Sequence, residues 1–169
     1  VLVEICRAAR ALPSPPGAPR PRDLMLDGFA LLITEGHAAA TPTLQRAVRA
    51  AASTPVEDVL SWGWMNAGAS AAVWDHKGWL ASCERQVQVV RDAGALAALP
   101  IHLTYLGMAI VWTGDFAGAA SLVAEIDSVA VVTGSRLGPG AALRLRSLQG
   151  KEAETSALIA STIEHAAAG

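Results

Sequence analysis

Apolar residues recur at helical spacing along most of this chain. In residues 78–92, for example, Trp79, Cys83, Val87 and Val90 fall on one stripe, as expected for a helix with about 3.6 residues per turn. β-branched residues also occur, but they do not alternate with polar residues between hairpin turns. The pattern therefore predicts an all-α protein.

Glycines, prolines and polar residues divide the apolar stretches into separate helices. Thr41 precedes one helix and Asp115 opens another, and both are suitable N-caps because a side-chain oxygen there accepts a hydrogen bond from the first turn. We expect helices at residues 23–35, 42–52, 57–74, 78–92, 96–113, 115–133, 141–149 and 151–167.

The first part of the chain has a different character. Residues 1–12 have the pattern of the end of a preceding helix. Residues 13–22 are expected to form a proline-rich linker, since five prolines lie between Pro13 and Pro21 and favour an extended, semi-rigid backbone. The remainder, residues 23–169, is expected to form a helical-repeat domain.

Helix-breaking turns return at a regular interval. They fall at Gly36, Asp75, Gly114 and Gly150, which are 39, 39 and 36 residues apart. An interval of this length is typical of one helical hairpin per repeat, and stacked hairpins form a solenoid. We therefore expect a right-handed solenoid of about four antiparallel helical hairpins.

One of these turns resembles the tetratricopeptide repeat. In the stretch TGDFAGAA at residues 113–120, a glycine ends one helix, an aspartate opens the next, and small residues follow. Tyr105 and Gly107 in the helix before the turn are also arranged roughly as in that family. The terminal proline of the tetratricopeptide consensus is missing from most units, so the expected fold is tetratricopeptide-like.

A longer set of motifs extends over most of the chain. These are LPSPPGAPRPRDLMLDGFALLITEG at residues 12–36, LQRAV at 44–48, WGWMNAGASAAVWD at 62–75, RQVQVVRDAGALAALPIHLTYLG at 85–107 and EAETSALI at 152–159. In this order they resemble the helical-repeat middle region of large ATP-binding LuxR-type transcriptional regulators of actinobacteria. The resemblance implies a P-loop ATPase before this region, a helix-turn-helix DNA-binding domain after it, and a regulatory role in between.

The sequence itself contains neither flanking domain of that family. It has no Gly-x-x-x-x-Gly-Lys-Ser/Thr motif for a nucleotide phosphate, because Glu152 stands where the Ser or Thr should follow Lys151. It also has no helix-turn-helix unit with a basic face after Gly134. We therefore interpret the chain as the array alone, which senses an effector or a partner for domains outside it. The alternative is a free-standing helical-repeat module that binds a peptide or a hydrophobic small molecule in its concave groove.

Composition narrows the expected partners and location. A formal net charge of −2 gives no basic surface for nucleic acid, so we expect no direct contact with it. Residues 93–108 come nearest to a membrane span but contain Pro100 and His102, so no membrane segment is expected. With two cysteines and no signal peptide, we expect a cytoplasmic location. An array that begins in mid-helix should expose apolar surface at one end, which favours homo-oligomers.

Residue types that could bind a metal or catalyse a reaction lie far apart in the sequence. The four histidines are widely separated and form no zinc-binding spacing, and no nucleophile with a base and an orienting group can be assigned. We therefore expect no enzymatic activity, no cofactor and no bound metal. The tryptophans are better candidates for binding, since an indole N–H needs a partner when it is buried. The residues expected to line a groove, with simple helix packing as the alternative, are Trp62, Trp64, His102, Tyr105, Met108 and Trp112.

Overall fold

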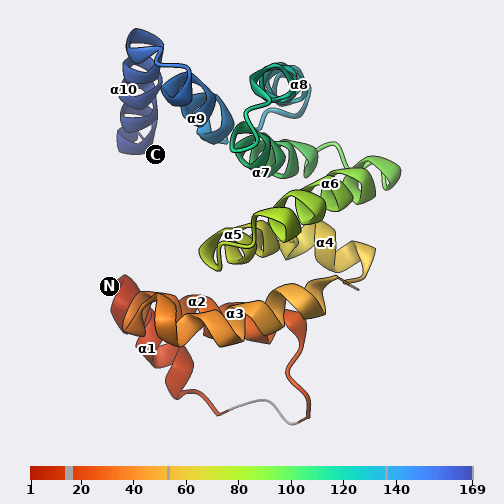
Figure 1. Ribbon diagram of the computed structural model, residues 1–169, viewed down its shortest axis with the longest axis vertical. Helices are drawn as coiled ribbons and strands as arrows, with labels where there is room; N and C mark the ends of the chain where they lie inside the picture. The colour runs from red at the N-terminus through yellow and green to blue at the C-terminus, as the bar shows by residue number, and fades with distance from the viewer. Residues whose placement is uncertain (14–16, 53, 136, 169) are drawn as a thin grey trace. The chain divides into compact units, whose positions relative to one another are not determined.

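The computed structural model describes residues 1–13, 17–52, 54–135 and 137–168, without the side chains of residues 165–168. Within these residues the chain forms ten helices and no strand, which confirms the all-α prediction (Figure 1). The helices are α1 (Leu2–Ala11), α2 (Pro21–Glu35), α3 (His37–Ala51), α4 (Val56–Trp62), α5 (Trp64–Ala72), α6 (His76–Asp92), α7 (Leu99–Val111), α8 (Phe116–Thr133), α9 (Gly140–Leu148) and α10 (Glu152–Ala168).

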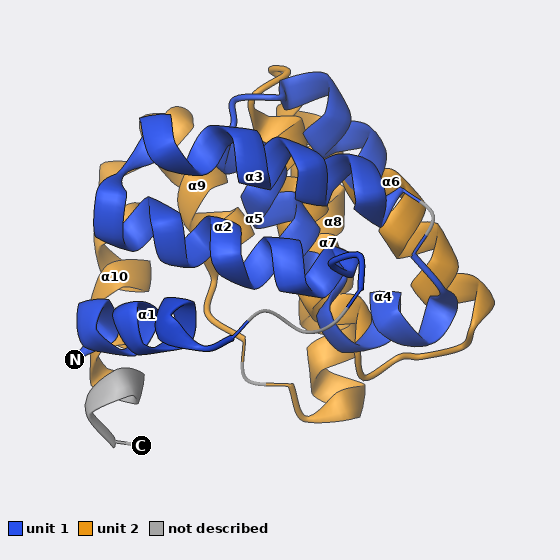
Figure 2. Cartoon of the chain, turned by 90° about the horizontal axis from the view of Figure 1, so that it is seen from below, with its two compact units in different colours: residues 1–82 blue, residues 83–169 orange. Residues whose placement is uncertain are grey.

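The chain divides into two compact units (Figure 2). Unit 1, Val1–Ser82, contains α1 to α5 and the first residues of α6, and unit 2, Cys83–Gly169, contains the rest of α6 and α7 to α10.

Unit 1 is built around the antiparallel pair of α2 and α3. Helix α1 packs on α2, and α5 packs mainly on α3. Four of the seven buried core residues are alanines, which let the helices approach closely. Gly28 of α2 marks the closest approach, because a Cβ atom at this position would lie 2.5 Å from the Leu44 Cδ2 atom. The buried core consists of Leu24, Met25, Ala40, Leu44, Ala47, Ala51 and Ala69.

Unit 2 is also built around a pair of consecutive helices. Helices α7 and α8 form a hairpin, α9 packs against both of them, and α10 packs on α9. Val111, Ala119 and Leu145 form a buried core cluster, with Phe116 and Val123 packed against it. Small residues again occupy a close contact: a Cβ atom on Gly107 of α7 would lie 3.0 Å from the Ala141 Cβ atom of α9.

Two of the helix-connecting turns share one hydrogen-bonding pattern. The Asp75 carboxylate accepts a hydrogen bond from the Gly78 amide at 3.0 Å, and the Asp115 carboxylate accepts one from the Gly118 amide at 2.7 Å. Each aspartate begins a helix, and each lies close over the glycine three residues later, where a Cβ atom would collide with the carboxylate. The sequence motif Asp-x-x-Gly thus forms the same cap at the start of both helices, and Asp115 is confirmed as an N-cap.

Removing the Asp115 cap should destabilise the α7–α8 hairpin. In Asp115→Ala the Gly118 amide loses its acceptor, and we expect the free energy of unfolding to fall by about 1 kcal/mol. Asp127→Ala is the matched control, because Asp127 is an exposed acidic residue in the same helix and caps no backbone amide. Urea unfolding that gives the same midpoint for both variants would contradict the capping role.

The structure corrects several expected helix starts, and those of α3 and α2 change the role of a particular residue. Helix α3 begins at His37 rather than at residue 42, so Thr41 is not an N-cap; its hydroxyl donates to the His37 carbonyl within the helix at 2.7 Å. Helix α2 begins at Pro21, the residue type that best fits a first helical position because it has no N–H to satisfy. Pro21 therefore belongs to the helix, while residues 14–16 of the expected linker lie outside the described residues.

The helix expected at residues 57–74 is two helices. Gly63 separates α4 from α5, although its backbone keeps helical dihedral angles of −55° and −33°. Its amide still donates to the Val59 carbonyl, whereas the Asn66 amide bonds back to Gly63 over only three residues. Glycine weakens a helix interior by about 1 kcal/mol relative to alanine, and here the tightened turn follows it directly.

Helix α8 is the most apolar long helix in the described part of the chain. Its 18 residues have a mean hydropathy of 1.5, which meets the length and hydropathy of a membrane-crossing helix. It therefore comes closer to a membrane span than residues 93–108, the stretch singled out from the sequence. It also carries Glu125, which forms an ion pair with Arg91 of α6 at 2.7 Å within unit 2.

Candidate functional site

The two groove tryptophans of unit 1 are half-buried. Trp62 packs against the core cluster of α2, α3 and α5, and its indole N–H is buried without a hydrogen-bond acceptor. Trp64 is also partly covered. Trp62 therefore contributes to packing between helices, which is the simpler of the two roles considered from the sequence.

His102 lies in the core of unit 2 and does not line an open surface. Its side chain is 1% exposed, and its Nδ1 atom lies 3.2 Å from the Gln86 Oε1 atom of α6. Because an amide oxygen only accepts, we assign the proton to Nδ1, which leaves Nε2 buried without a donor. Burial lowers the pKa of His102 to about 4, so the imidazole is neutral at pH 7.

Trp112 and Met108 are brought together at the end of α7. The Arg144 guanidinium of α9 lies 5.6 Å from the centroid of the Trp112 ring, a cation–π arrangement, and its Nη1 atom lies 3.5 Å from the Met108 carbonyl. Trp112 is 58% exposed, whereas Met108 and Tyr105 are half-buried. Burial, with a smaller contribution from Cys83, raises the pKa of the Tyr105 phenol.

The six expected groove residues are divided between the two units. Trp62 and Trp64 belong to unit 1, and the other four belong to unit 2. Within unit 2, Met108 and Trp112 share Arg144, while His102 points into the core. Trp112 is the most exposed of the six.

Three hollows in the described surface are lined by residues other than the six expected groove residues. A hollow of about 420 Å³ in unit 1 lies between α1, the linker and α2, and one of about 100 Å³ in unit 2 lies between α7, α8 and the start of α9. A third hollow, of about 200 Å³, lies between α3 and the α5–α6 turn, and is lined by Gln45, Val48, Arg49, Val73 and Asp75.

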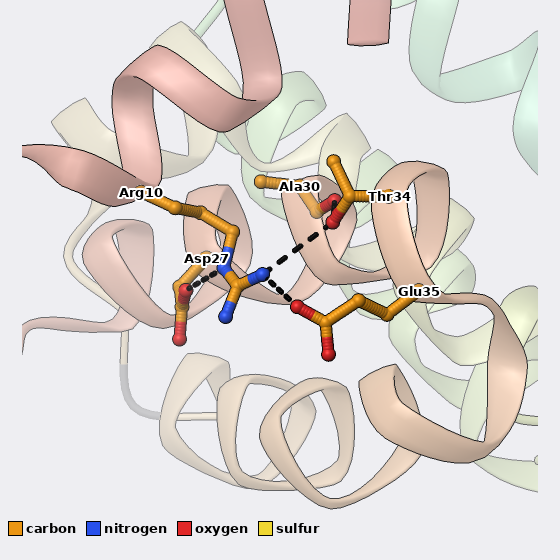
Figure 3. A network of polar contacts seen from close by, with 5 residues as sticks. All are labelled: Arg10, Asp27, Ala30, Thr34 and Glu35. Carbon is orange, nitrogen blue, oxygen red and sulfur yellow. Dashed lines mark hydrogen bonds and ion pairs between the residues drawn. The ribbon is translucent and has the colours of Figure 1, made fainter. Parts of the chain in front are cut away.

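Arg10 occupies the charged side of the largest of these hollows. Its guanidinium pairs with Glu35, lies 3.7 Å from the Asp27 carboxylate and 3.5 Å from the Thr34 hydroxyl (Figure 3). The Thr34 hydroxyl in turn donates to the Ala30 carbonyl at 2.8 Å. The contacts tie α1 to α2, so these charges serve the packing of unit 1.

The residue that the sequence analysis missed is Trp74. Its side chain is 86% exposed, and among the described residues it is the only one other than glycine with a positive φ, at 59°. The shared Asp-x-x-Gly motif provides a signal that could have found it. When Asp75 is aligned with Asp115, Trp74 occupies the position of Gly114, whose φ is 82°.

The described residues include no group of three or more His, Cys, Asp or Glu side chains that could hold a metal ion. Comparison with known proteins gave no match, whether to a protein-family model, a curated protein or a solved structure.

Proposed function

We propose that this chain is a non-catalytic helical-repeat region that mediates protein interaction and regulation in a LuxR-type transcriptional regulator. The observation that supports the proposal is the interval of 36–39 residues between helix-breaking turns in the sequence, together with the shared Asp75–Gly78 and Asp115–Gly118 caps at two of these turns. Stacked hairpins expose long, continuous surfaces, which helical-repeat proteins use to bind partners. The resemblance of the ordered sequence motifs supplies the family and the regulatory role.

The coding sequence that flanks this chain gives the first test. The proposal expects a P-loop ATPase before the array and a helix-turn-helix domain after it. Flanking sequence that encodes neither domain would contradict the regulator and leave the free-standing module as the better explanation.

A second test asks whether the array couples the two flanking domains. In the full protein, Gly107→Leu forces bulk into the contact between α7 and α9, where even an added Cβ atom would lie only 3.0 Å from the Ala141 Cβ atom. We expect this variant to lose most of the effect of ATP on DNA affinity, measured as the ratio of dissociation constants with and without ATP. Gly138→Leu is the control, because nothing lies within 4 Å of a Cβ atom there. An unchanged ratio in correctly folded Gly107→Leu would exclude coupling through this contact.

A further inference from the structure

The turn between α5 and α6 holds a tryptophan in a backbone conformation that suits glycine. The Trp74 amide donates to the Ala71 carbonyl, and the Asp75 amide donates to the Ser70 carbonyl, both at 3.1 Å. This pair of hydrogen bonds is the Schellman motif, in which the residue at the Trp74 position adopts a left-handed conformation. The same hydrogen-bond pair closes the turns at Gly94 and Gly150, where φ is 62° and 70°.

The Trp74 side chain contributes little packing that would stabilise the fold. A left-handed conformation is unfavourable for any residue with a Cβ atom. A large side chain could offset that cost by packing, but the Trp74 side chain is 86% exposed. Residues held in sparsely populated backbone conformations cluster at functional sites, so the conformation of Trp74 points to a role beyond the fold.

The surface beside Trp74 has the features of an anchoring site. The residues on either side of it, Val73 and Asp75, line the hollow of about 200 Å³ together with Val48 and Arg49 of α3. Small-molecule sites have volumes of about 300–1,000 Å³, so this hollow suits one side chain of a partner rather than a whole ligand. Tryptophan and arginine are also among the residues that contribute most to binding energy in protein interfaces.

Charge indicates the chemistry of the partner. The Arg49 side chain is exposed and makes no ion pair among the described residues, so its guanidinium is available to a carboxylate. Asp75 is the acidic residue of the hollow, but its carboxylate accepts from the Gly78 amide at the N-terminus of α6, where the helix dipole offsets its negative charge.

We propose that Trp74, with the adjoining Val48–Val73 hollow and Arg49, is a docking site for an acidic protein segment. An apolar side chain of the segment enters the hollow, a neighbouring carboxylate pairs with Arg49, and the backbone of the segment lies against the indole. The site is separate from the groove expected from the sequence and does not depend on the proposed role in transcription.

Selection from a displayed random-peptide library against the chain tests the proposal. We expect the selected peptides to carry an aspartate or glutamate next to a large apolar residue. Trp74→Gly should weaken their binding by about 30-fold or more, as for the loss of an interface hot spot. Arg49→Glu should weaken binding by about fivefold or more. Arg7→Glu, the same change in charge at an exposed position of α1, should leave it unchanged.

The stability of Trp74→Gly separates docking from a structural role. If the tryptophan is strained and unpacked, glycine should raise the thermal midpoint by about 2–4 °C. A lower midpoint would show that Trp74 supports the fold, and would overturn the proposal. Selected peptides that bind Trp74→Gly as well as the original chain would also overturn it. So would Trp74-dependent binding of oligodeoxythymidine without any binding of acidic peptides, since this result would assign the site to nucleic acid.

Discussion

Acidification from pH 7 to pH 4 should remove about 3 kcal/mol from the stability of unit 2 through His102 alone. The unfolded histidine has a pKa near 6.5, whereas burial lowers the folded value to about 4. Between these values the unfolded chain binds the proton more readily, so stability is lost as the pH falls through this window. The difference of about 2.5 pKa units, at about 1.4 kcal/mol per unit, sets an upper limit of about 3.5 kcal/mol. About 3 kcal/mol of this is lost by pH 4, where about half of the folded histidine is still unprotonated. His102 is 1% exposed, so water does not weaken the effect appreciably.

Comparison with His102→Gln isolates this histidine from the carboxylates that titrate in the same range. Glutamine can keep a hydrogen bond to Gln86 but does not titrate, so urea unfolding of this variant should show a pH dependence smaller by about 3 kcal/mol. His76→Gln should retain the full dependence, because His76 is exposed on α6. If His102→Gln and the original chain lose stability in parallel, His102 is not buried in the neutral form.

The sequence predicted the helices of this chain better than it predicted which of their residues are exposed. Apolar periodicity identifies a helix because one stripe must face other helices, and Val87 and Val90 are indeed buried. The same signal does not distinguish a core position from the wall of a groove. His102 has the spacing of either, and only its contact with Gln86 of another helix places it in the core.

The helix boundaries that were predicted wrongly depended on residues that can occupy either the start or the interior of a helix. A threonine before a proline resembles an N-cap, but Thr41 lies inside α3 because its hydroxyl can also bond to the carbonyl four residues earlier. The exposure of Trp74 was missed for a related reason. Apolar residues are usually counted toward a helix, and the left-handed turn at this position is visible only when Asp75 is aligned with Asp115.

Replacing Leu44 by alanine should destabilise unit 1 by about 2–5 kcal/mol, because the leucine is 1% exposed at the α2–α3 crossing. Gly28→Ala should by itself cost about 1–3 kcal/mol, less a partial gain in helix propensity, since the new methyl group collides with Leu44. With Leu44 already truncated, the same methyl group fills vacated space, and Gly28→Ala should become stabilising. Chemical unfolding of the four proteins in this double-mutant cycle should give a coupling of about 1–3 kcal/mol.

Gly68→Ala is the control: its methyl group meets Phe29 at an ordinary 3.5 Å, so its effect should be the same with or without Leu44. Additive effects of Gly28→Ala and Leu44→Ala would show that the two helices do not cross at Gly28.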